Sequence, residues 1–155
     1  MQVGTRWTLV AAGLMLSVPI GLLAQTVEAE RVRAVVAALA QYSEDKNLAA
    51  MDTLYAPDAW VRVIEGAGVN TGWIDYRDNH LGPELAEMKN LAYRHFEIEP
   101  QIRGNVAWAP FRYELGIDGS EGRVEVEGRG TAILERRGAR WLVVHLHTSG
   151  RRKRS

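Results

Sequence analysis

Cysteine is absent from this 155-residue chain. Neither disulfide bonds nor thiol chemistry can therefore contribute, so stability must come from burial of a core or from association between copies of the chain. Phenylalanine is scarce, with two residues against five tryptophans and five tyrosines. The length, with 46% hydrophobic and 25% charged residues, is typical of a single soluble globular domain.

An excess of basic charge is also lacking. The formal net charge is zero, but four of the bases lie in the last five residues, and the range 25–150 holds 14 basic against 19 acidic residues. A domain with a negative net charge is a poor partner for the phosphate backbone of a nucleic acid, so we expect no nucleic-acid partner. The basic range 151–155 is predicted to be a solvated, disordered tail without an assigned role.

Residues 1–24 are predicted to be a secretory signal peptide. Arg6 precedes the uncharged run 7–23, which is interrupted by Pro19. A membrane helix needs ~20 apolar residues, and this run is slightly short, so an uncleaved anchor is the alternative. We therefore expect a periplasmic or secreted domain over 25–150, with no membrane partner after cleavage, or else a domain anchored by its N-terminus.

Helical spacing dominates the first half of the domain. Apolar residues recur every three or four positions between Val32 and Tyr42, as in an amphipathic helix. A residue before proline is pushed out of the helical region, so the next helix must end before Pro57. Pro83 is expected to break or re-start a third helix. The predicted elements are a helix from Thr26, a helix from Leu48, a strand over 59–65, a loop over 66–72 and a helix from Trp73.

Long extended segments fill the second half and are joined by glycine-containing turns, which predicts an antiparallel meander. Helices followed by such strands form the α+β pattern, in which helices cover one face of a curved sheet. The last segment is apolar on both faces, so the second face needs another layer, and a homodimer or higher homo-oligomer is expected. The segments are 91–102, 106–117, 123–136 and 140–148.

Three segments together resemble the SnoaL-like group of the nuclear transport factor 2-like superfamily. They are Leu-Tyr-Ala-Pro-Asp-Ala-Trp at 54–60, Gly-Trp-Ile-Asp-Tyr-Arg at 72–77 and Trp-Leu-Val-Val-His-Leu-His-Thr-Ser-Gly at 141–150. The last is also similar to the final strand of the calcium/calmodulin-dependent kinase association (hub) domain. The resemblance implies a cone-shaped, cystatin-like α+β fold, in which N-terminal helices pack on a curved, mostly antiparallel sheet and enclose a cavity. Superfamily members include isomerases, dehydratases, small-molecule binders and oligomerisation modules, so the fold alone does not select an activity.

The resemblance can be carried onto individual positions. The histidine of the hub-domain anion pocket falls on Tyr76 and one of its arginines on Arg112, whereas the other two arginines fall on Ala132 and Thr148. The pocket is therefore at most partly kept. In a ketosteroid isomerase, a tyrosine and a carboxylate base act on the substrate. Their places here are taken by Leu39 and Val63, which argues against that chemistry.

His80 is the histidine expected to approach the cavity, because it shares a helical stripe with Trp73 and Tyr76. It is a candidate ligand contact, or the acid or base of an isomerase, dehydratase or hydrolase. The carboxylates near the expected mouth, Glu65 among them, are interpreted as solvated surface charges. No cofactor is predicted.

His145 and His147 lie two apart on the last strand and point the same way, so a periplasmic metal-binding protein is a further alternative. The resemblance places Thr148 on the cavity side, which turns the histidine pair to the convex face as packing or interface residues. The leading hypothesis is an exported, self-associating domain that binds a small, partly apolar molecule. The predicted lining residues are Trp73, Tyr76, His80, Arg112 and Thr148.

Overall fold

The computed structural model describes residues 20–153. Most of the predicted signal peptide, residues 1–19, lies outside this range, as do the last two residues of the basic tail. Among the described helices, none combines the length and hydropathy that a membrane crossing requires.

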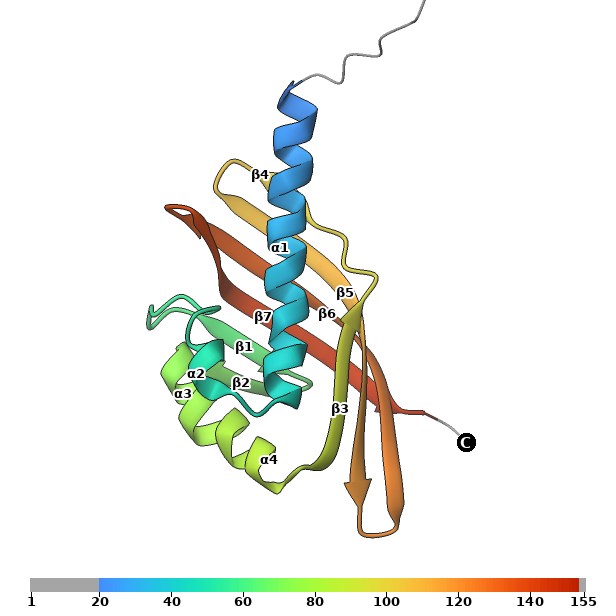
Figure 1. Ribbon diagram of the computed structural model, residues 1–155. Helices are drawn as coiled ribbons and strands as arrows, with labels where there is room; N and C mark the ends of the chain where they lie inside the picture. Colours follow the sequence, from blue (N-terminus) through green and yellow to red (C-terminus); the bar gives the residue numbers. More distant parts are fainter. Residues whose placement is uncertain (1–19, 154–155) are drawn as a thin grey trace, which may run out of the picture.

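The described chain folds as helices on a curved sheet, which confirms the α+β prediction (Figure 1). The helices are α1 (Ile20–Glu44), α2 (Leu48–Met51), α3 (Trp73–Tyr76) and α4 (Gly82–Glu87), with a π-helical turn, Arg77–Leu81, between the last two. The strands are β1 (Arg62–Glu65), β2 (Gly68–Thr71), β3 (Lys89–Phe96), β4 (Gln101–Arg103), β5 (Val106–Gly119), β6 (Gly122–Arg137) and β7 (Arg140–Arg152).

The sheet has the strand order β2-β1-β7-β6-β5-β3, with β4 paired to β5. The consecutive strands β5, β6 and β7 pair antiparallel, so the predicted meander is confirmed. The strand β1 joins the far side of β7 in parallel, and β2 closes the edge as an antiparallel hairpin with β1. The glycine-rich range 66–72, expected as a loop, therefore contains a strand.

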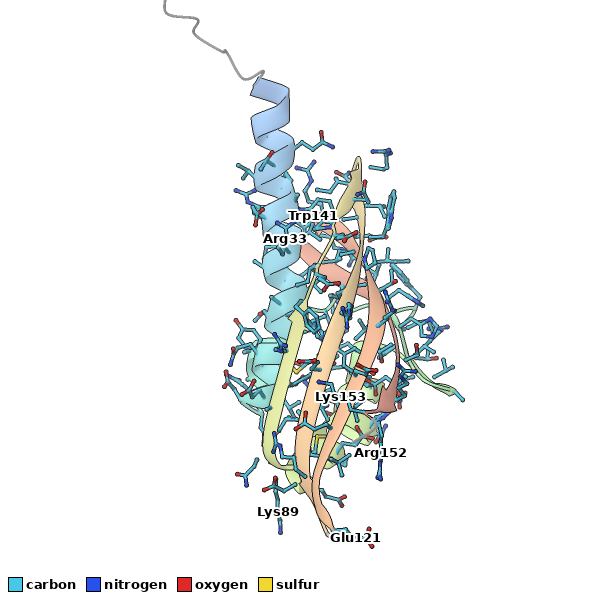
Figure 2. All side chains as sticks on the ribbon, turned by 90° about the vertical axis from the view of Figure 1, so that its right-hand side faces the viewer. Arg33, Lys89, Glu121, Trp141, Arg152 and Lys153 are labelled. Carbon is cyan, nitrogen blue, oxygen red and sulfur yellow. The ribbon has the colours of Figure 1, made fainter. Side chains whose placement is uncertain are left out.

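Helix α1 lies across one face of the sheet, and the side view shows the opposite face with no described helix over it (Figure 2). Its apolar stripe is buried, with Val32 and Val36 fully inaccessible and Leu39 2% exposed. Polar contacts add to this packing: the indole nitrogen of Trp141 in β7 donates to Glu28 of α1 over 2.8 Å. Burial of the stripe supplies most of the stability of such a helix.

A β-bulge in β7 changes which residues face α1. The pairing register between β6 and β7 shifts between Ile133 and Leu134, so Val144 is skipped and Val143 pairs with Leu134. The extra residue reverses the alternation before it. Trp141 and Val143, which simple alternation places on the same face as His145, therefore turn toward the helices.

Two predicted segment ends differ in the structure. The expected strand 91–102 is divided into β3 and β4, and Glu97 between them has a φ of 49°, which interrupts an extended strand. Residues 151 and 152, predicted to belong to a disordered tail, are instead the last residues of strand β7. The guanidinium of Arg151 pairs with Glu127 at 2.9 Å, and the ammonium of Lys153 pairs with Glu114 at 2.7 Å.

Two glycines of β6 make room for aromatic rings on the helix side of the sheet. In the register of β5 and β6, Phe111 lies opposite Gly130 and Tyr113 lies opposite Gly128. A Cβ at Gly128 would overlap the Tyr113 ring and the backbone oxygen of Ser149. The rings of Phe111 and Tyr113 can therefore lie flat on the sheet and fill the core.

We expect Gly128→Ala to lower the free energy of unfolding by about 1–3 kcal/mol, because the added methyl group overpacks the core against backbone atoms that cannot yield. Urea denaturation followed by tryptophan fluorescence measures the change. Arg129→Ala, one residue along and exposed, is the control and should stay within about 0.5 kcal/mol of the wild type. A Gly128→Ala protein as stable as the wild type would contradict this packing.

Candidate functional site

A cavity of about 70 Å³ lies between α1, the helices α2 to α4 and the helix-facing side of the sheet. Most of its wall is apolar, and its polar lining residues are Ser43 of α1, Tyr93 and His95 of β3, and the group Tyr55, Glu65, Tyr76 and Glu84. The apolar lining comes from Leu39, Met51, Leu81, Leu85, Met88, Leu91, Leu115 and Leu146. An apolar cavity with a few convergent polar groups is the usual form of a small-molecule site.

Glu65 is the last residue of β1, and its carboxylate is drawn into the protein at the cavity mouth. The hydroxyl of Tyr76 donates to one carboxylate oxygen over 2.9 Å, and the ε-nitrogen of His80 lies 3.3 Å from the other. The side chain is 31% exposed. Burial raises the pKa of Glu65 above its ordinary value, although the Tyr76 hydrogen bond and the nearby His80 oppose the shift.

His80 lies on the π-helical turn that joins α3 to α4. Gly82 and Pro83 explain this turn: proline cannot donate to the carbonyl of residue 79, and a Cβ at Gly82 would lie 2.8 Å from the carbonyl oxygen of Arg77. The helix widens but continues through the proline. The third helix is thereby re-started rather than ended, and His80 faces Glu65.

A chain of hydrogen bonds orients the His80 ring. The δ-nitrogen lies 2.7 Å from the side-chain oxygen of Asn70, and the amide nitrogen of Asn70 donates to Asp75 over 3.0 Å. Because an amide oxygen can only accept, the δ-nitrogen of His80 carries the proton. The ε-nitrogen, on the other side of the ring, lies 3.3 Å from Glu65 and 3.1 Å from Glu84. Together, the imidazole and the two carboxylates can exchange a proton or hold a cation.

The Tyr55 hydroxyl forms no hydrogen bond to any described residue, although the side chain is 2% exposed and lines the cavity. The ring is held by the indole of Trp73, stacked at 4.1 Å between ring centroids and 8° between planes. Burial and the nearby Glu65 carboxylate raise the pKa of Tyr55 well above its ordinary value. A neutral donor inside the cavity thus remains available to another molecule.

His95, another lining residue, links β3 to α1. Its δ-nitrogen donates to the backbone oxygen of Val36 over 2.8 Å, and its ε-nitrogen lies 3.0 Å from the Tyr93 hydroxyl. Desolvation lowers the pKa of His95 to about 4, so the ring is neutral at physiological pH.

Of the predicted cavity residues on the third helix, only Tyr76 is among the lining residues. His80 is not a lining residue and lies next to one, with its ε-nitrogen 3.3 Å from Glu65. Trp73 stands behind Tyr55 instead, and its indole nitrogen donates to Asp52 over 2.7 Å. Thr148 is buried on the cavity side of β7 but is not a lining residue.

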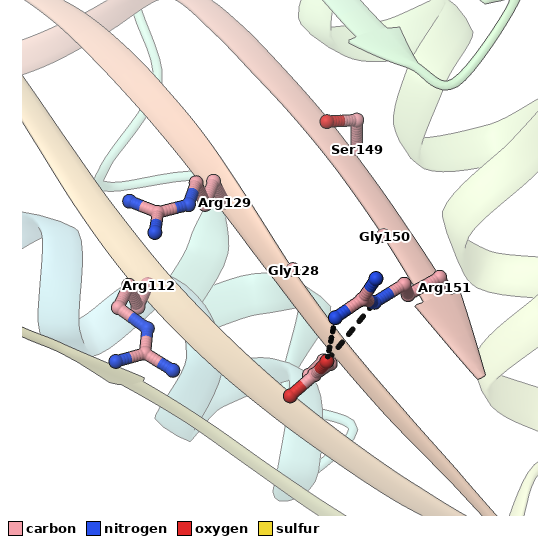
Figure 3. A pocket seen from close by; sticks show the side chains of 7 residues that line it. Arg112, Gly128, Arg129, Ser149, Gly150 and Arg151 are labelled. Carbon is pink, nitrogen blue, oxygen red and sulfur yellow. Dashed lines mark hydrogen bonds and ion pairs between the residues drawn. The ribbon is translucent and has the colours of Figure 1, made fainter. Parts of the chain in front are cut away.

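Arg112 does not line this cavity, contrary to the expectation. In the register of β5 and β6, Arg112 lies opposite Arg129. Its neighbours Phe111 and Tyr113 face the helices, so strand alternation directs the Arg112 side chain to the open face of the sheet. There it lies beside Arg129 and Arg151 in a shallow groove (Figure 3). Its guanidinium is 3.2 Å from Glu97, so an ion pair accounts for it.

His145 and His147 also face away from the cavity. They pair with Ile133 and Thr131 on the open side of β6, as strand alternation predicts. His80 lies on the other side of the sheet and cannot join them at one metal. The pair is thus separated from the polar cluster at the cavity mouth.

Three site residues were missed or misjudged from the sequence. Glu65 was interpreted as a solvated charge, although it follows Val63 by two residues and so shares its face of the strand. Glu84 is four residues after His80, a spacing that brings side chains together on a helix. Tyr55 had no such signal, because its unpaired hydroxyl depends on packing.

His95 should make the protein acid-sensitive. Its pKa in the folded state, about 4, lies below the unfolded value of about 6.5, so protons bind preferentially to the unfolded chain. Its contribution to stability is therefore complete above pH 6.5 and is lost as the pH falls toward 4, by up to roughly 3 kcal/mol in total.

Chemical denaturation between pH 4 and pH 7 measures this dependence. We expect His95→Gln to be less stable at neutral pH but to lose less stability on acidification, and His147→Gln, which alters an exposed histidine, to follow the wild type. Parallel pH profiles for the wild type and His95→Gln would contradict the assignment.

Comparison with known proteins supports the fold. A comparison with curated proteins finds no match. Similar solved structures include a nuclear transport factor 2-like superfamily protein from Salmonella enterica serovar Typhimurium, a candidate ketosteroid isomerase from Shewanella frigidimarina and a protein with a cystatin-like fold from Caulobacter vibrioides. Their identities are 15%, 22% and 15%, and their TM-scores are 0.75, 0.61 and 0.65. The matches cover 84%, 70% and 79% of this chain and 96%, 86% and 88% of the others.

At these identities the solved structures establish the fold alone, and the similarity of the last strand to the hub domain stays a prediction. The family is established separately, since the model of the SnoaL-like domain matches residues 32–151. With this match over most of the chain, and with the nuclear transport factor 2-like architecture of the sheet and helices, the chain belongs to the SnoaL-like domain family.

Proposed function

We propose that this domain binds a small, partly apolar molecule whose polar end enters the cavity and accepts a hydrogen bond from Tyr55. The observation that carries the proposal is the buried hydroxyl of Tyr55, which lines a mostly apolar cavity and has no hydrogen-bond partner among the described residues. Leaving such a group without a partner costs about 1–3 kcal/mol. A ligand oxygen placed there would recover this free energy on binding.

The shape of the cavity limits the ligand. A dry cavity of about 150 Å³ accommodates benzene, so the roughly 70 Å³ enclosed here takes only one end of a molecule. The remainder would extend through the mouth beside Glu84, whose side chain is 49% exposed. Because Tyr55 is a donor, the inserted end should carry a carbonyl or hydroxyl oxygen.

The export signal predicted for residues 1–24 supports placing this binding function in the periplasm or outside the cell. A small-molecule role is in keeping with the fold, since one structure of the same fold, at 22% identity, is a candidate ketosteroid isomerase. Neither observation names the ligand.

Tyr55→Phe tests the proposal, because it removes one hydroxyl and leaves the ring stacked on Trp73. We expect the free protein to be as stable as the wild type or more stable, while the affinity for a cavity ligand falls about 10-fold through loss of one hydrogen bond. The ligand is to be found by a thermal-shift screen of short ketones, phenols and carboxylic acids, and its affinity measured by calorimetry.

Tyr93→Phe is the matched control for stability, because it removes a hydroxyl that already has a hydrogen-bond partner. Its hydroxyl is bonded to His95, so its removal should lower the free energy of unfolding by about 1 kcal/mol, unlike the removal of the Tyr55 hydroxyl. The proposal fails if no compound stabilises the wild type, or if Tyr55→Phe binds the best compound as tightly as the wild type does.

We further propose that two copies associate through the open face of the sheet. Trp108, Ile133 and His145 are cross-strand neighbours on this face and form a row across β5, β6 and β7. Trp108 is 37% exposed, and Val106 two residues before it is 41% exposed. A second copy related by a two-fold axis would place the same row against itself and cover the apolar surface.

Light scattering coupled to gel filtration should show a dimer for the wild type and a monomer for Trp108→Arg, which places a charge in the proposed interface. Trp60→Arg is the control, since Trp60 is 51% exposed but precedes the sheet. A monomeric wild type, or a dimeric Trp108→Arg protein, would contradict this interface.

A further inference from the structure

We propose that Glu65, His80 and Glu84 bind one divalent transition-metal ion, with Zn²⁺ as the best-matched ion, at the mouth of the cavity. The proposal goes beyond the proposed function, since the ion needs no organic ligand in the cavity. It also differs from the metal site considered for His145 and His147, which lie on the other face of the sheet.

The three donor groups are already close enough to share an ion. Each offers one ligand atom, and these atoms lie within 4.8 Å of one another. The ε-nitrogen of His80 is 3.3 Å from Glu65 and 3.1 Å from Glu84. Two ligands each about 2.1 Å from one metal at an angle near 100° are separated by about 3.2 Å, so the observed spacing suits Zn²⁺ coordination.

The surrounding residues hold the donors in the orientation that a metal requires. Metal-binding histidines usually donate their other ring N–H to an oxygen, which fixes the ring and directs the free lone pair at the ion. Here Asn70 accepts from the δ-nitrogen of His80 and is itself tied to Asp75. Tyr76 donates to one oxygen of Glu65 and leaves the other directed at His80.

A buried group without a partner stands beside this cluster. Tyr55 lines the same cavity as Glu65 and Glu84, and its hydroxyl is hydrogen-bonded to none of the described residues. Three protein ligands leave a fourth position on Zn²⁺ for water or another oxygen. Such an oxygen, held on the cavity side, would find a polar neighbour in Tyr55.

The mixed donor set selects the class of ion. Imidazole suits Zn²⁺ and its first-row neighbours, whereas Ca²⁺ and Mg²⁺ take oxygen ligands and gain little from His80. Two carboxylates balance the charge of a divalent ion. A bound ion would also relieve the close approach of the Glu65 and Glu84 carboxylates, which repel each other.

The experiment is a calorimetric titration of the purified chain, freed of affinity tag and of metal by chelation, with Zn²⁺ and separately with Mg²⁺. We expect saturable binding of one Zn²⁺ per chain and at least about 10-fold weaker binding to Glu84→Gln, which removes a ligand. Asn70→Ala should weaken binding about 10-fold by releasing the His80 ring. Glu84 is half exposed, so its substitution should leave the fold intact.

Glu87→Gln, on the same helix and outside the cluster, is the matched control and should bind like the wild type. Co²⁺ gives an independent readout, because its visible absorption should develop in the wild type, disappear on addition of Zn²⁺ and be lost in His80→Gln. The proposal is overturned if Zn²⁺ binding is not saturable, if Glu84→Gln keeps wild-type affinity, if Mg²⁺ binds as tightly as Zn²⁺, or if substitution of His145 and His147 abolishes the binding.

Discussion

The parallel pairing of β1 with β7 is the contact on which the arrangement of the site depends. It places Val63 beside Leu146 and Glu65 beside Thr148, so both β1 side chains face the helices. Val63 is 1% exposed and anchors the strand in the core, and the next residue on that face is a carboxylate at the edge of the cavity. The same strand that stabilises the sheet therefore carries a charged group into a partly desolvated position.

The helices α3 and α4 supply the partners that make this position tolerable. A carboxylate removed from water needs hydrogen-bond donors or an opposite charge, and here the Tyr76 hydroxyl and the His80 ring lie against its two oxygens. The π-helical turn forced by Gly82 and Pro83 brings His80 into this place. A feature that weakens the helix locally thus organises the polar site.

Aromatic packing separates this polar cluster from the rest of the core. The stack of Tyr55 on Trp73 and the pairing of Phe111 and Tyr113 with glycines of β6 fill space between the helices and the sheet. The enclosed volume left over is small, and its lining includes a few polar groups. The domain consequently combines a closely packed interior with a polar cavity mouth, while the open face of the sheet remains available for another chain.

The amino-acid sequence by itself determined the order of the helices and of the long strands, the meander and the place of His80 on the third helix, because these follow from local periodicity and turn chemistry. It did not determine the short strands β2 and β4. The family could also be identified from it, through short segments such as 141–150. Only the tertiary structure decided that Arg112 faces away from the cavity, that Glu65 is drawn into its mouth and that the Tyr55 hydroxyl is unpaired. These depend on which face of each strand meets the helices and on packing between distant segments, and local spacing alone does not fix either of them.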